Sequence, residues 1–79
     1  MNWNYRILQD DDGNLSLHEV FYDSAGNPKG YTENPVTFVA ASDEGVESIV
    51  QALEMALKDA KERPVLNLHQ IKVSSIDII

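Results

Sequence analysis

The sequence predicts a small α+β fold, an antiparallel β-meander with one amphipathic α-helix packed on one face. Two observations carry this prediction. Residues 3–22 alternate between apolar and polar on either side of a turn, as the strands of a hairpin do. Apolar residues recur at helical spacing over residues 43–61. Because 79 residues are enough for one domain and too few for two, we expect a single domain over residues 1–79.

The hairpin is expected to pair a strand from Trp3 to Gln9 with a strand from Leu15 to Tyr22. Between them lies an acidic turn whose glycine supplies positive φ and whose Asp and Asn side chains bond nearby backbone groups. Successive strand residues point to opposite faces, so one helix can cover only one face of the sheet. The other face, which we expect to be open, carries Arg6, His18, Val20 and Tyr22.

A third strand is predicted at about residues 31–39. The turn region before it contains Gly26-Asn27, which permits a reversal, and Pro28, which cannot donate to a ladder and is expected to end pairing. Pro35 predicts a break or bulge within the third strand and marks that strand as an edge or as two short pieces.

The helix is predicted over residues 43–61. We expect its apolar stripe to be used entirely in core packing and Ser42 or Asp43 to cap its first turn. Pro64 is expected to end the helix, because the residue before a proline is pushed out of the α region. The stripe consists of Val46, Ile49, Val50, Leu53, Ala56, Leu57 and Ala60.

The tail, residues 65–79, is predicted to form a fourth strand. Its last two residues are isoleucines, which favours burial either in the core or against another copy of the chain. Together with the edge marked by Pro35, this apolar tail predicts a homodimer.

The charge balance excludes one class of partner. Thirteen acidic residues against six basic ones give a net charge of −7, which repels the phosphate backbone, so we expect no direct nucleic-acid binding. The acidity is consistent with solubility alone, and also with complementarity to a basic partner, including the nucleic-acid groove of another protein. The absence of cysteine, of a signal peptide and of a long apolar run predicts a cytoplasmic protein without a membrane segment.

Asp10, Asp11 and Asp12 invite interpretation as a calcium loop. Calcium loops place ligands at alternate positions and finish with a distant bidentate acid, whereas these three acids are adjacent. A hairpin turn with solvated carboxylates is therefore the better interpretation, and we predict no metal site and no cofactor.

Catalytic motifs are also missing from the sequence. There is no cysteine, no serine in a nucleophile elbow and no glycine-rich phosphate loop. His18 and His69 are the only histidines, and two histidines without a placed carboxylate do not define a metal site. His18 is expected to be a surface residue if its face is open and a hydrogen-bonded core residue if it is buried. We predict no catalytic residue and no enzymatic activity.

Five segments carry a resemblance to known proteins: MNWNYRI at the start, the strand LHEVFYD, the turn GNPKG, the segment YTENPVTF and the helix that ends in RPVL. Through these segments the chain resembles, over residues 1–66, a family of small bacterial proteins with no established activity. The resemblance implies a stand-alone bacterial domain and nothing about mechanism.

These observations predict a non-enzymatic module that binds a protein partner. The predicted binding surface is the open sheet face with the acidic turn beside it: Arg6, His18, Val20, Tyr22, Asp10, Asp11 and Asp12. One alternative is an inhibitor from a phage or mobile element whose acids, aligned along a ridge, imitate nucleic acid. Another is a small enzyme or ligand-binding domain, which would require a concave pocket with convergent polar groups.

Overall fold

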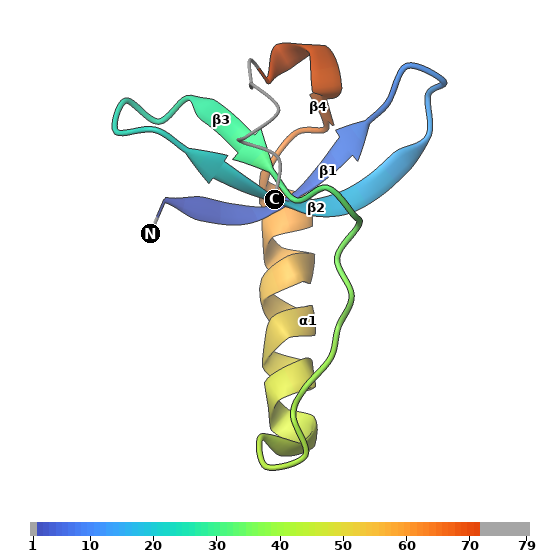
Figure 1. Cartoon of the computed structure of the whole chain (residues 1–79), viewed down its shortest axis with the longest axis vertical. Coiled ribbons are helices and arrows are strands. Elements are labelled where there is room, and N and C mark those ends of the chain that lie inside the picture. The colour runs from blue at the N-terminus through green and yellow to red at the C-terminus, as the bar shows by residue number, and fades with distance from the viewer. Residues whose placement is uncertain (1, 72–79) are drawn as a thin grey trace.

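The computed structural model describes residues 2–71 and confirms an α+β fold with one long helix beside a four-stranded sheet (Figure 1). A fourth strand is present within the predicted tail, but it is short and lies at residues 66–67, and residues 72–79 lie outside the described residues. The elements in chain order are β1 (Trp3–Gln9), β2 (Leu15–Tyr22), β3 (Pro28–Tyr31), α1 (Gly45–Glu62), β4 (Leu66–Asn67) and a 3-10 turn, η1 (Leu68–Gln70).

The sheet is mixed and runs in the order β3-β2-β1-β4, so the predicted purely antiparallel meander is wrong. β1 pairs antiparallel with β2, as the hairpin pattern predicts, and β2 pairs antiparallel with β3. β4 pairs in parallel with β1 over Leu8 and Gln9 only. A parallel neighbour needs a long crossover connection, which the chain through β2, β3 and α1 supplies.

The two hairpin turns share one pattern, Asp-x-x-Gly-Asn, at residues 10–14 and 23–27. In each turn the first Asp accepts two backbone N–H groups through its Oδ1 atom at 2.9 Å, those of the residues two and four positions later. Gly13 and Gly26 both have φ of 85°, which a glycine adopts without strain. The acidic turn at residues 10–14 is thus stabilised by the carboxylate of its own first residue, Asp10.

The third strand lies earlier than predicted, at Pro28–Tyr31, and Pro28 begins pairing instead of ending it. A proline is tolerated at the first residue of an edge strand, where its missing N–H is not needed. Beyond β3 the chain still donates single bonds to β2, from Thr32 to Glu19 O at 3.0 Å and from Val36 to Leu17 O at 2.8 Å. The predicted break near Pro35 falls between these two bonds.

The helix begins at Gly45 and ends at Glu62, within two residues of the prediction. Arg63 is extended, as the following proline requires. The predicted cap at Ser42 or Asp43 is wrong: Glu44 occupies that position, and its side chain accepts the backbone N–H of Ala41 instead of a helical one. A separate turn at residues 42–44 precedes the helix and displaces the predicted caps from it.

Much of the core lies on the sheet face that was expected to be open, whereas Tyr5 and Ala56 are buried on the helix side. Leu8, Val20, Leu66 and Ile71 form a buried cluster, against which Tyr22, Tyr31 and Leu68 pack. The strands curl (Figure 1), and side chains from the segment after α1, Leu66, Leu68 and Ile71, pack on this face. Val20 is consequently 0% exposed and His18 6% exposed, so the expectation of a bare face is wrong.

The helix projects away from the sheet, so that its N-terminal half extends beyond the strands with the connection from β3 beside it (Figure 1). Among the strands, α1 packs chiefly against β1, and Ala56 is its only buried residue. The expectation that the apolar stripe is used entirely in the core is therefore wrong. Packing covers only one edge of the stripe, because most of the helix has no strand opposite it.

Candidate functional site

The most distinctive surface of the described chain is a row of large apolar side chains along α1. Their exposed fractions are 75% for Val46, 37% for Val50, 47% for Leu53 and 58% for Leu57. We call these four residues the α1 stripe. Their successive spacings of four, three and four place them on one side of the helix, as in the seam of a coiled coil.

The α1 stripe is bordered differently on its two sides. On one side lie Ile49, Ala52 and Ala56, which are partly or fully buried. The other side carries Glu47, Glu54, Lys58 and Lys61. An apolar centre with a charged border is the usual organisation of a protein–protein interface. Single exposed apolar residues are ordinary on protein surfaces, whereas four in one row form a continuous patch.

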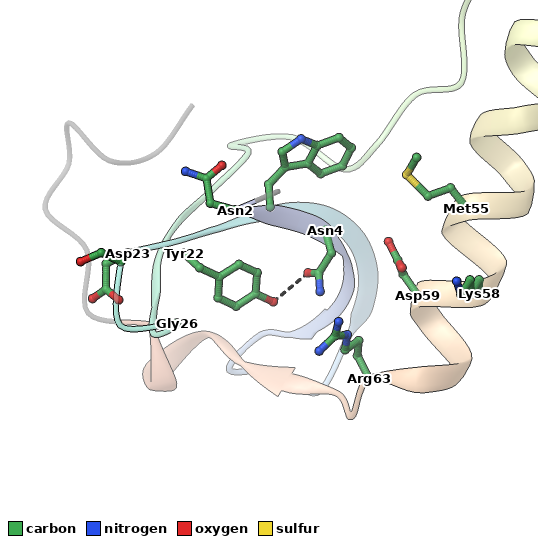
Figure 2. A pocket seen from close by; sticks show the side chains of 11 residues that line it. Asn2, Asn4, Tyr22, Asp23, Gly26, Met55, Lys58, Asp59 and Arg63 are labelled. Atoms are coloured by element: carbon green, nitrogen blue, oxygen red, sulfur yellow. Dashed lines mark hydrogen bonds between the residues drawn. The ribbon is translucent and has the colours of Figure 1, made fainter.

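The second candidate surface is concave: a groove of about 500 Å³ between the curled sheet and the C-terminal half of α1 (Figure 2). This volume falls within the range of small-molecule sites. The groove is lined by Asn2, Trp3, Asn4, Tyr22, Asp23, Ser24, Gly26, Met55, Lys58, Asp59 and Arg63.

Several polar groups in this groove already have partners within the fold. The Tyr22 hydroxyl donates to Asn4 Oδ1 at 2.7 Å (Figure 2), and it accepts from Arg6 at 3.2 Å. Asp59 Oδ2 accepts the backbone N–H of Tyr5 at 3.1 Å, on the edge of β1 that β4 leaves unpaired there. Burial, with the nearby Glu19 and Asp59 carboxylates, raises the pKa of the Tyr5 hydroxyl. The hydrogen bond from Tyr5 to Asp59 therefore joins β1 to α1 beside this groove.

The four residues predicted for the open sheet face do share one face, but they are engaged in the fold. Arg6 donates to Pro64 O at 3.1 Å and to the Tyr22 hydroxyl, which ties β1 to the end of the helix. Val20 lies in the core cluster, and His18 is buried beside Tyr31. Their role in partner binding stays a prediction, and His18 and Val20 offer almost no surface for it.

His18 is buried and hydrogen-bonded, as expected for a residue on a covered face, but its partners were not predicted. Its Nε2 atom lies 2.9 Å from Ser16 Oγ, and its Nδ1 atom lies 2.8 Å from the carbonyl oxygen of Thr32. A carbonyl can only accept, so in the neutral imidazole Nδ1 carries the proton and the Ser16 hydroxyl donates to Nε2. The sequence signal is a serine and a histidine two residues apart on one strand face.

A serine bonded to an oriented histidine is the arrangement of an activated nucleophile. Acyl transfer also needs donors aimed at the developing oxyanion. The imidazole of His18 is almost fully buried, and both of its ring nitrogens are hydrogen-bonded within the fold. We therefore interpret the Ser16–His18–Thr32 chain as a crosslink inside the core.

The three predicted acids of the first turn have different surroundings. Asp10 organises the turn, the exposed Asp11 carboxylate contacts the His69 imidazole, and Asp12 is exposed. The second acidic turn lies at the other end of β2, whose eight residues span about 26 Å. Across residues 2–71, no group of three or more His, Cys, Asp or Glu side chains is placed to hold a metal ion.

Comparisons with protein-family models, with curated proteins and with solved structures found no match for this chain. The resemblance of residues 1–66 to small bacterial proteins thus stays a prediction. In the part of the chain described, no helix combines the length and the apolar character that crossing a bilayer demands.

Proposed function

We propose that this protein is a non-enzymatic interaction module that binds another protein chain through the α1 stripe. The observation that carries the proposal is the exposure of four aligned Val and Leu side chains on a helix that extends beyond its own sheet. A helix with an apolar row of this spacing is a standard element of protein recognition. The proposed surface thus lies on the helix instead of the sheet face.

The size of the α1 stripe bounds the affinity it supports. Full burial of a Val or Leu side chain contributes about 1.5–3 kcal/mol, and these four are roughly half exposed, so covering them contributes on the order of 4 kcal/mol. Association costs at least as much in lost translational and rotational freedom. The partner must therefore add contacts with the charged border, and we expect a reversible complex.

The inhibitor that imitates nucleic acid is not favoured by any observation on the described residues. Such an inhibitor needs its acids in one continuous ridge, whereas the two acidic turns lie at opposite ends of β2. In both turns the first aspartate is also occupied in holding the backbone. The groove of Figure 2 meets the shape requirement for a ligand-binding domain, but the bonds of Asp59 and Tyr22 give it a role within the fold.

The proposal is tested by placing a photo-crosslinking amino acid at position 53 in the protein expressed in its native host. Leu53 lies in the α1 stripe, and Gln51 lies on the polar side of the same helix, so the same replacement at position 51 is the matched control. We expect illumination to give covalent adducts with protein from position 53 and far fewer from position 51. No adduct from position 53, or equal adducts from both positions, would contradict the proposal.

A further inference from the structure

The α1 stripe has a symmetry of its own. Val46 and Leu57 are equally far from the midpoint between Gln51 and Ala52, and Val50 and Leu53 are also equally far from it. A two-fold interface uses the same patch on both copies, so the patch must be complementary to itself. A row that reads Val, Val, Leu, Leu meets this condition when two copies run antiparallel, because each valine then lies level with a leucine.

We propose that the α1 stripe binds the α1 stripe of a second copy in an antiparallel arrangement. This inference rests on the proposed function and names the partner of that surface. Val46 of one copy packs against Leu57 of the other, and Val50 packs against Leu53. The two-fold axis repeats both contacts, so the interface has four layers. Each layer contains one Val and one Leu side chain.

The charges beside the α1 stripe favour the antiparallel orientation. The first turns of the helix region carry Glu44 and Glu47, whereas Lys58 and Lys61 lie toward its other end. In the antiparallel pair, Lys58 comes nearly level with Glu47 of the second copy, and Lys61 comes nearly level with Glu44. A parallel pair would set this charged border against the Ile49 and Ala52 side of the other copy, so these charges would lack opposite-charge partners, and it would align the two helix dipoles unfavourably.

The position of the sheet favours the same orientation. α1 projects from one side of the sheet, so antiparallel helices place the two sheets at opposite ends of the helix pair (Figure 1). Two parallel helices would bring both sheets to the same end. From Val46 to Leu57 the stripe rises about 16 Å, which is short for a stable interface. We therefore expect a monomer–dimer equilibrium instead of a permanent dimer.

The orientation is tested by disulfide crosslinking, which is simple to interpret because the chain has no cysteine. The variants are Val46→Cys and Leu57→Cys, with a purification tag on one of them. Antiparallel pairing brings positions 46 and 57 of different copies together and keeps identical positions about 16 Å apart. A disulfide needs Cα atoms within roughly 7 Å.

Under a mild oxidant we expect the mixture to form the mixed disulfide and neither variant alone to form a dimer. Gln51→Cys mixed with Leu57→Cys is the control, since Gln51 lies on the polar side. Self-crosslinking of the single variants would overturn the antiparallel arrangement. Equal crosslinking in the control mixture would overturn the role of the α1 stripe.

Sedimentation of the unmodified chain from roughly 1 µM to roughly 1 mM supplies an independent measurement. We expect the mass to rise from 8.8 kDa toward twice that value, and Leu53→Glu to remain monomeric with an unchanged circular dichroism spectrum. A monomer at every concentration would overturn the second copy as partner. If position 53 still crosslinked to a different protein in the host, the proposed function would stand without this inference.

Discussion

Asp10 and Asp23 occupy the first position of two turns with the same Asp-x-x-Gly-Asn pattern, and each carboxylate accepts two backbone N–H groups at 2.9 Å. Each turn is also closed by backbone bonds between its first and last residues, at 3.0 and 2.9 Å. Part of the acidic character of the chain, with its net charge of −7, is therefore explained by hairpin formation without any partner. The repeated pattern is visible in the sequence, and it accounts for both turns.

Replacement of Asp23 tests this role directly. Asp23→Ala removes the acceptor for two backbone N–H groups, so we expect a loss of about 1–2 kcal/mol in the free energy of unfolding. Asp23→Asn keeps an acceptor oxygen and should lose much less. Asp12→Ala, at an exposed position with no side-chain bond in the described chain, is the control and should stay within about 0.5 kcal/mol. Urea unfolding measures all three, and equal losses for Asp23→Ala and Asp12→Ala would contradict the argument.

The Tyr5 hydroxyl is expected to make the free energy of unfolding depend on pH in the alkaline range. Burial, Glu19 and Asp59 raise the pKa of this hydroxyl above the ordinary value of 10.0 in the folded chain. Between the unfolded and the folded pKa, only the folded state keeps the proton, so stability contributed by this group is present below pH 10.0 and is lost as pH rises through the folded pKa. Tyr5→Phe should therefore show a smaller fall in stability from about pH 9 to about pH 11 in urea unfolding. An equal fall in both proteins would refute this assignment.

Among the helices and strands, those that depend on nearby residues in the sequence were predicted from local sequence patterns. The hairpin of β1 and β2 and the helix α1 are encoded by alternation, turn residues and helical spacing, and both lie within two residues of the predicted bounds. β3 and β4 are different. Pro28 both ends a turn and begins an edge strand, and only the position of β2 decides that it pairs. β4 is two residues long and exists because β1 has a free edge beside it.

His18 connects two of these elements, since it lies on β2 and bonds to Thr32 just after β3. His18→Leu replaces the imidazole with an apolar side chain of similar size, and it leaves the Thr32 carbonyl and the Ser16 hydroxyl without this partner. We expect a loss of about 1–3 kcal/mol, measured by urea unfolding.

Ser16→Ala removes only the outer bond of that chain and serves as the comparison. We expect it to cost less than His18→Leu, because Ser16 is partly exposed and the His18 bond to Thr32 remains. The opposite order would contradict the interpretation of this chain as a crosslink centred on His18.

For the whole molecule, the sequence could not reveal which apolar residues stay outside the core. The helical periodicity identified seven apolar positions of α1 as one stripe, but the fraction of them that packs depends on how far the helix lies over the sheet. The orientation of the helix relative to the sheet results from contacts between residues distant in sequence, such as Asp59 with Tyr5 and Arg6 with Pro64. For the same reason, the curled sheet and β4 covered the face that alternation alone left open. The sequence therefore predicted a binding surface on the sheet, whereas the candidate surface in the structure lies on the helix.

The division into a packed sheet and a projecting helix predicts a pattern of amide hydrogen exchange. Residues 46–53 of α1 lie mostly beyond the sheet, whereas Ala56 is buried against it. In dilute solution we expect the amides of 46–53 to exchange faster than those of the β1–β2 ladder. When the concentration exceeds the dimer dissociation constant about tenfold, binding should slow exchange across residues 46–57 by roughly tenfold. The slowing should be absent in Leu53→Glu at the same concentration. Unchanged exchange of 46–57 in the unmodified chain would mean that no second copy covers the α1 stripe.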